Sequence, residues 1–114
     1  MESHEVKRIW LFDRLKDSVA LLAAPPDIQL REMPISGRKA DELFLRFDHW
    51  RMKVVGTFQS EIAADQLFCL DSIQQVFLKM GRECWSDDGL NNSAEWNHVR
   101  RLSTQTLEVF GWSR

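Results

Sequence analysis

The sequence lacks any run of apolar residues long enough to cross a membrane. Its longest uncharged stretch around an apolar segment, Ser18 to Pro26, has nine residues, whereas a membrane-spanning helix needs about 20. The first fifteen residues carry charges throughout, so they have neither the apolar core nor the small-residue cleavage site of an export signal. We therefore expect a cytoplasmic protein without a membrane partner.

Cysteine and glycine are also scarce. The two cysteines, Cys69 and Cys84, are expected to be free thiols, because a reducing compartment disfavours a disulfide. Five scattered glycines match no phosphate-binding loop, and no G-x-S-x-G elbow or C-x-x-C pair is present. His4, His49 and His98 have no paired spacing that would favour zinc. We expect no enzyme activity, no cofactor and no metal site.

Neither sign of charge dominates. The 114 residues contain 15 Lys and Arg against 17 Asp and Glu, which gives a net charge of −2. Without a strong positive field, nucleic acid is a poor candidate partner. A hydrophobic fraction of 44% and a charged fraction of 28% are typical of globular proteins, so residues 1–114 are expected to form a single domain.

The periodicity of apolar residues predicts a mainly α fold with about four helices. Good helix formers greatly outnumber Val, Ile and Thr. The predicted helices cover residues 5–23, 38–55, 60–80 and 92–110. Ser36 and Ser60 are candidate N-caps, and Gly56 and Gly81 are candidate C-terminal glycines. Because residues 43–58 also resemble two short strands, an α+β fold with a hairpin there is the alternative.

The segment between the first two predicted helices has no clear period. Residues 25–37 include all three prolines of the chain, and Ile28 to Arg31 alternates apolar and polar residues. This stretch fits either a short edge strand or a loop over the core. Long ordered loops often carry function, so a ligand pocket under this loop, in a small helical enzyme or ligand-binding protein, is the second functional hypothesis.

The last quarter of the chain, CWSDDGLNNSAEWNHVRRLSTQTLEVFGW, contains the most motif-like features. Asp87, Asp88 and Gly89 are typical of a turn. Asn92 and Glu95 have capping-box spacing, and Ser93 is the alternative N-cap. The buried face of the following helix is expected to carry Trp96, Val99, Leu102, Leu107 and Phe110. Gly111 and Trp112 then predict a Schellman motif at the end of the helix.

Three basic residues of this helix, His98, Arg100 and Arg101, are expected on its surface. A basic helical face suggests a third hypothesis, a helical DNA-binding regulator. Acidic residues at the start of the same helix and just before it would repel phosphates, which disfavours this reading.

Trp85 and its acidic neighbours form the candidate binding site. Trp85 lies in the loop after Gly81, next to Ser86 and the two aspartates, so it fits either a cover for the core or an exposed anchor. A tryptophan among carboxylates has the composition of a binding hot spot for a basic partner. We predict a partner-binding patch made of Trp85, Asp87, Asp88 and Glu95.

The acidic loop WSDDGL and the helix start NNSAEW give the chain a general resemblance to a class of small bacterial proteins. These are the immunity proteins that neutralise toxins delivered by neighbouring cells, as in contact-dependent growth inhibition. The resemblance implies a non-catalytic inhibitor that binds a toxin domain by charge complementarity. It transfers no residue role by position. Oligomeric state is left open, since an apolar stripe fits its own core or a second copy.

Overall fold

The computed structural model describes residues 3–33 and 38–112, which form six α-helices and two short 3-10 helices. In chain order they are α1 (His4–Ala23), α2 (Pro26–Glu32), α3 (Lys39–Phe58), η1 (Gln59–Glu61), α4 (Ala64–Lys79), η2 (Arg82–Trp85), α5 (Asp87–Asn92) and α6 (Ala94–Val109). No strand occurs in this part of the chain. The expected mainly α fold is confirmed, and the hairpin alternative at residues 43–58 is wrong because α3 spans them.

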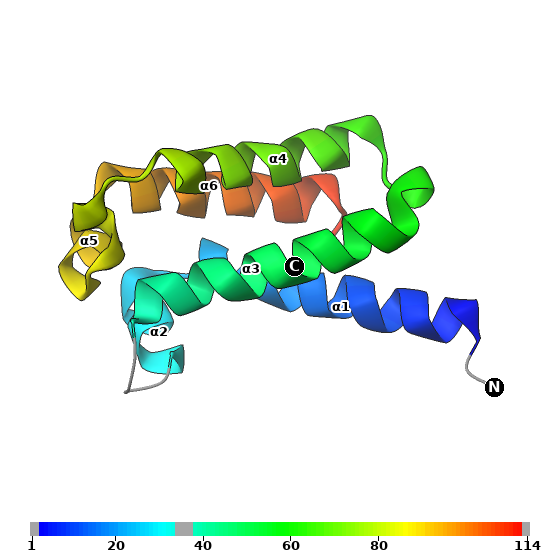
Figure 1. Cartoon of the computed structure of the whole chain (residues 1–114), viewed down its shortest axis with the longest axis horizontal. Coiled ribbons are helices and arrows are strands. Elements are labelled where there is room, and N and C mark those ends of the chain that lie inside the picture. Colours follow the sequence, from blue (N-terminus) through cyan, green and yellow to red (C-terminus); the bar gives the residue numbers. More distant parts are fainter. Residues whose placement is uncertain (1–2, 34–37, 113–114) are drawn as a thin grey trace.

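The four long helices form two layers (Figure 1). α4 lies along α6 in one layer and α3 lies along α1 in the other, while α1 also contacts α6 across the layers. The short helices α2 and α5 meet at the end of the molecule that is far from the N-terminus. The described chain measures 44 × 29 × 26 Å.

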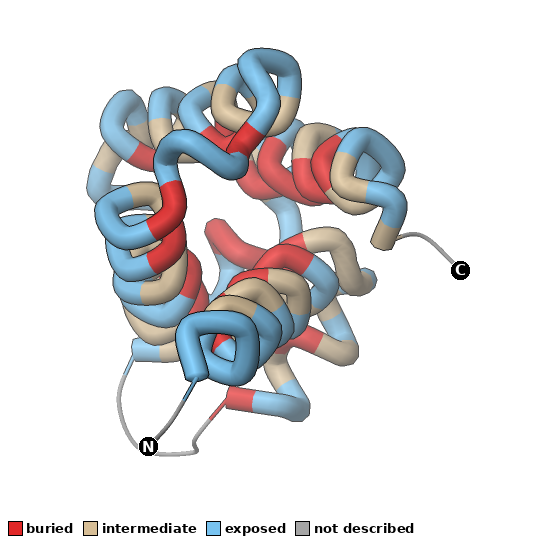
Figure 2. Tube along the Cα trace, turned by 90° about the vertical axis from the view of Figure 1, so that its right-hand side faces the viewer, coloured by how far each residue is buried: buried red, intermediate tan, exposed pale blue. Residues whose placement is uncertain are grey.

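The core fills the space between the two layers. Buried positions of each long helix turn toward the inside of the molecule (Figure 2). Leu15, Phe47, Ile73 and Trp96, one from each long helix, have no solvent-exposed surface. Burial of such large apolar side chains stabilises the fold by roughly 2 kcal/mol each.

Local signals explain where α1 begins and ends. Ser3 is its N-cap, and the Ser3 Oγ accepts a hydrogen bond from the Val6 N–H. The helix stops at Ala23 because Ala24 precedes a proline and adopts an extended backbone. Two apolar residues near its start, Val6 and Ile9, are more than half exposed, since they lie on the face opposite Leu11 and Leu15.

The segment 25–37 was expected to be a strand or a loop, and the described part is instead α2. Pro26 occupies its first turn, where a proline costs no hydrogen bond. Gln29 is fully buried, and its Nε2 donates to the carbonyl oxygens of Leu21 and Leu22 at the end of α1. α2 therefore supplies a hydrogen-bond donor to free carbonyl groups at the C-terminal end of α1. Residues 34–37, including the candidate cap Ser36, lie outside the described residues.

Two other predicted helix ends are wrong. Gly56 does not end α3, which continues to Phe58 because that side chain is buried in the core. Ser60 does not begin the next helix. It lies in η1. α4 starts at Ala64, and the N–H of the preceding residue, Ala63, donates a hydrogen bond to the Gln66 side chain at 2.9 Å.

The final helix behaves largely as predicted. Ser93, the alternative cap, is the N-cap of α6 and accepts from the Trp96 N–H at 3.1 Å, so Asn92 is not the cap. At the other end, the Trp112 N–H donates to the Leu107 carbonyl and Gly111 has a φ of 72°. This is the predicted Schellman motif.

Candidate binding surface

Trp85, at the end of η2, is half-buried and rests on other aromatic rings. Its ring stacks on Phe77 at 6.0 Å, and it meets Phe44 at 5.8 Å and Trp96 at 6.2 Å in edge-to-face contacts. The indole thus contributes to the core and also keeps an accessible side. Its position combines the two roles that the sequence left open.

Asp87 and Asp88 lie in the first turn of α5, so the predicted turn is the start of a short helix. Ser86 is the N-cap, since its Oγ accepts from the Gly89 N–H at 2.9 Å. Both carboxylates are exposed, and Asp88 accepts a hydrogen bond from the Asn92 side chain at 2.9 Å. Acidic side chains at a helix N-terminus are favoured by the helix dipole. Their exposure leaves both available to a partner.

Glu95 lies beside Glu83, which was not among the residues predicted for the patch. Carboxylate oxygens of Glu95 and Glu83 and the Cys84 Sγ all lie within 4.8 Å of one another. Neither glutamate forms an ion pair with a described Lys, Arg or His. Residues 83–95 therefore supply four carboxylates at the α5 end of the molecule, and Glu83 should be added to the predicted patch.

Cys84 is a poor metal ligand despite these neighbours. The residue is fully buried, and this burial, followed by the charge of Glu95, raises the pKa of its thiol. A thiol must lose its proton before it binds a metal. Among the described residues, this trio is the one group of three potential metal ligands, and it contains no histidine.

The two cysteines should differ strongly in reactivity. Cys69 is partly exposed and Cys84 is buried, so we expect iodoacetamide to label Cys69 first and Cys84 only after unfolding. Burial raises the pKa of the Cys84 thiol in the folded state. The free energy of unfolding should therefore be highest below the unfolded-state pKa of about 8.5, where the thiol is neutral in both states. It should fall as the pH rises through the folded-state pKa. Mass spectrometry after timed alkylation from pH 7 to pH 10 measures both rates. Equal labelling of the two would contradict the expectation.

A hollow of about 380 Å³ opens next to Trp85. We call it the Trp85 hollow. It is lined by Arg38, Asp41, Phe44, Leu45, Arg82 and Trp85. These residues come from α3 with its N-cap and from η2. The indole is therefore flanked by two arginines as well as by the carboxylates that follow it in the chain.

A second, larger groove of about 1090 Å³ runs between α1, α2 and the end of α6. Its lining includes Pro25, Ile28 and Glu32 of the segment 25–37, with Thr104 and Trp112 from the last part of the chain. It is an open groove with mixed charged and apolar walls.

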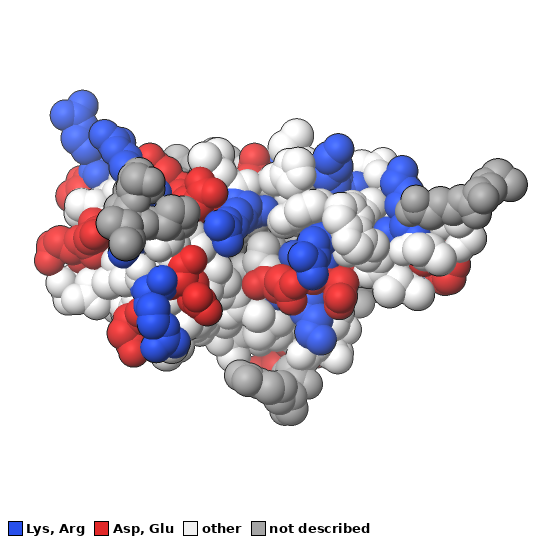
Figure 3. Space-filling view, turned by 90° about the horizontal axis from the view of Figure 1, so that it is seen from below, with Lys and Arg blue, Asp and Glu red and all other residues white. Residues whose placement is uncertain are grey.

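On the face seen in Figure 3, acidic and basic side chains alternate, and no large patch has a single sign.

Arg100 corrects the expected basic face of α6. Its side chain is buried, and both terminal nitrogens donate to the Leu90 carbonyl oxygen of α5. The loss of solvation lowers the pKa of Arg100. The guanidinium thus joins α5 to α6 inside the molecule. His98 and Arg101 remain exposed, but the face predicted for DNA has lost one of its three basic side chains.

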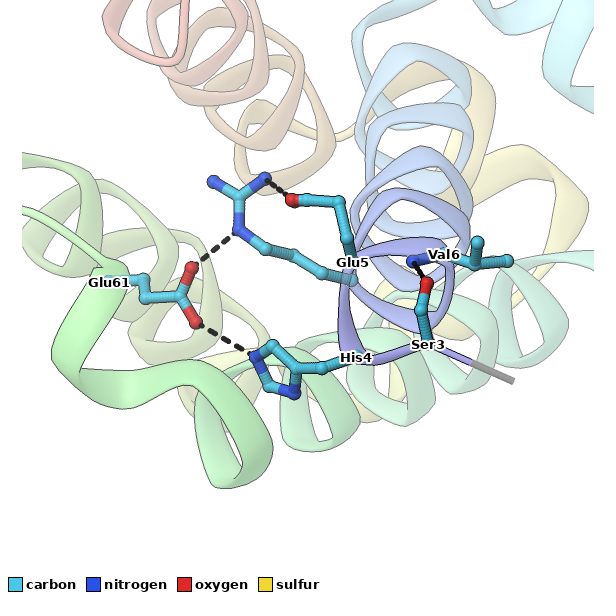
Figure 4. Close-up of polar contacts among 6 residues, drawn as sticks. Ser3, His4, Glu5, Val6 and Glu61 are labelled. Carbon is cyan, nitrogen blue, oxygen red and sulfur yellow. Dashed lines mark hydrogen bonds and ion pairs between the residues drawn. The ribbon is translucent and has the colours of Figure 1, made fainter. Parts of the chain in front are cut away.

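A separate polar cluster holds the start of α1 against η1 (Figure 4). Glu61 accepts a hydrogen bond from Arg8 Nε at 2.5 Å and lies 3.6 Å from His4 Nε2, while Glu5 pairs with Arg8 at 3.7 Å. The His4 ring also meets Phe58 edge to face. These contacts join two elements and are accounted for by the fold.

Comparison with known proteins places the chain in no family: no family model, curated protein or solved structure matches it. Among the described residues, no helix is both long enough and apolar enough to cross a membrane.

Proposed function

We propose that this chain is a non-catalytic protein-binding module, and more specifically an inhibitor of the immunity type that binds a toxin domain. The observation that carries the proposal is the state of Trp85. Its ring is partly buried on a base of Phe77, Phe44 and Trp96 and keeps an accessible side. A large side chain already held in place loses little conformational entropy on binding, and such tryptophans are common hot spots.

Charge supplies the second part of the proposal. Trp85 has acidic residues on both sides in the sequence: Glu83 before it, and Asp87, Asp88 and Glu95 after it. None of these four carboxylates forms an ion pair with a described cation. Exposed carboxylates attract a basic surface and speed the encounter, and the tryptophan is then buried. An inhibitor of this kind would cover the active site of a basic toxin domain, as the resemblance implies.

The direct test is affinity capture from the native host followed by titration of the purified partner. We expect Trp85→Ala to weaken binding by roughly 30-fold, corresponding to about 2 kcal/mol, because a hot-spot residue is lost. Asp87→Asn with Asp88→Asn should mainly slow association and reduce its dependence on salt. The matched control is Trp10→Ala, whose side chain is 53% exposed on α1. Equal losses for Trp85 and Trp10 would overturn the proposal.

A second candidate function is favoured by the groove of about 1090 Å³ beside α2. It lies where the sequence analysis placed a ligand pocket, although α2 rather than a loop forms its wall. Its charged lining includes Lys16, Asp17 and Glu32, which could orient a small polar ligand. Saturable shifts of the Ile28 and Thr104 amide signals with a small molecule would support this function. A screen without such shifts would leave it without support.

A further inference from the structure

The Trp85 hollow has an apolar floor and a cationic rim. Phe44, Leu45 and Trp85 supply the apolar surface, and Leu45 is 55% exposed. Arg38 and Arg82 stand on the rim together with one acid, Asp41. A volume of about 380 Å³ lies near the lower end of the range of ligand pockets in proteins, so the hollow suits a small group.

The two arginines are free to meet an incoming anion. The Arg38 side chain is 77% exposed, and its contact with Asp41 is long, at 3.8 Å. Exposed pairs of this kind contribute little stability and exchange easily. Arg82 forms no ion pair and no side-chain hydrogen bond with any described residue. Two positive charges against one negative charge leave the rim with a formal charge of +1.

The sign of this rim differs from that of the neighbouring surface. Glu83 and Glu95 lie close together and do not line the hollow, whereas Arg38 and Arg82 both do. Arginine binds carboxylates in a fixed two-pronged geometry and can also lie against aromatic faces. An apolar group that carries a carboxylate therefore fits the hollow better than an amine does.

We infer that the Trp85 hollow receives an acidic segment of the partner protein. An aromatic side chain of that segment would cover Phe44, Leu45 and Trp85, and a neighbouring carboxylate would bind between Arg38 and Arg82. This inference rests on the proposed function and refines it. The partner must then present basic groups to the carboxylates of residues 83–95 and one acidic, aromatic knob to the hollow.

Two short peptides of opposite charge test the inference on the whole ¹⁵N-labelled protein. The probes are acetyl-Gly-Glu-Phe-Glu-Gly-amide and acetyl-Gly-Lys-Phe-Lys-Gly-amide. We expect the acidic peptide to shift the Trp85 indole N–H signal and the Arg82 Nε–H signal saturably. The lysine peptide should shift them far less, and added salt should weaken the effect.

Charge reversal supplies the matched variants. Arg82→Glu should weaken acidic-peptide binding at least tenfold. Lys53→Glu makes the same change of charge on the exposed surface of α3 and should leave binding unchanged. Equal or stronger shifts with the lysine peptide would overturn the inference. The absence of shifts with the acidic peptide at roughly 10 mM would also overturn it, because this concentration detects binding even in the millimolar range.

The outcome separates this inference from the proposed function. If a captured partner depends on Trp85 but the acidic peptide does not bind, the inference is wrong and the proposed function stands. If the acidic peptide binds at the hollow and no protein partner depends on Trp85, the site binds acidic aromatic groups and the proposed function fails.

Discussion

Gly89→Ala is expected to destabilise the protein by at least about 3 kcal/mol, at the upper end of the cost of overpacking. A Cβ at position 89 would lie 2.2 Å from the Glu83 carbonyl oxygen and 2.7 Å from backbone carbons of Cys84. All of these are backbone atoms, so no side-chain rotation relieves the clash. Thermal unfolding should shift down by more than about 10 °C. The variant should also move η2, which carries Trp85.

Gly56→Ala is the matched control for this substitution. Gly56 lies inside α3, is exposed, and has no atom within 4 Å of an added Cβ. Alanine in a helix interior is favoured over glycine by roughly 0.5–1 kcal/mol, so this variant should be more stable than the parent. If the two glycine variants changed stability by the same amount, the close contact of α5 with η2 would be refuted.

Trp96→Ala is expected to cost about 3–5 kcal/mol, which is the range for loss of a large aromatic side chain from a core. Trp96 has no exposed surface and contacts Phe77 and Trp85. Its Nε1 donates to the Cys84 carbonyl oxygen at 2.8 Å. The substitution removes a ring that supports Trp85, so partner affinity should fall with stability.

Two further variants identify what Trp96 contributes. Trp96→Phe keeps an aromatic ring but leaves the Cys84 carbonyl without its donor, and a cost between about 1 and 3 kcal/mol is expected. Trp10→Ala removes a ring that is 53% exposed and should cost less than Trp96→Ala. Chemical denaturation of the three variants measures these differences. Equal costs at positions 10 and 96 would contradict the packing described above.

The parts of the fold that depend on local sequence were predicted well. Ala24 before Pro25 ends α1, and Gly111 with Trp112 forms the Schellman motif, because these effects act within a few residues. The apolar period predicted for α6 reflects burial, since Trp96 and Val99 are buried and Leu102 is partly buried. The extent of α3 was also predicted to within three residues at its end, with the error arising from a glycine that the helix tolerates.

Tertiary context determined the features that were missed. α2 is too short to show a helical period, and its buried Gln29 is explained only by the carbonyl groups of α1. Arg100 reads as a surface charge in the sequence. It is buried because the Leu90 carbonyl of α5 faces it. Neither partner is marked by spacing along the chain.

The candidate site was predicted in part for the same reason. Trp85, Asp87 and Asp88 are neighbours in sequence, so their grouping could be seen directly. The hollow could not be predicted, because Arg38 and Phe44 come from the N-cap and the body of α3, far from Trp85 in the sequence. The closeness of Glu83 to Glu95 could not be predicted either, because these residues belong to η2 and α6 and meet only in the folded chain.

Hydrogen exchange of backbone amides in the complex with the captured partner tests most directly whether the surface around Trp85 binds another protein. The account predicts slower exchange for residues 82–95 in the complex than in the free protein, with no change for the exposed start of α1. Protection confined to the outer faces of α1 and α3, with residues 82–95 unchanged, would contradict it.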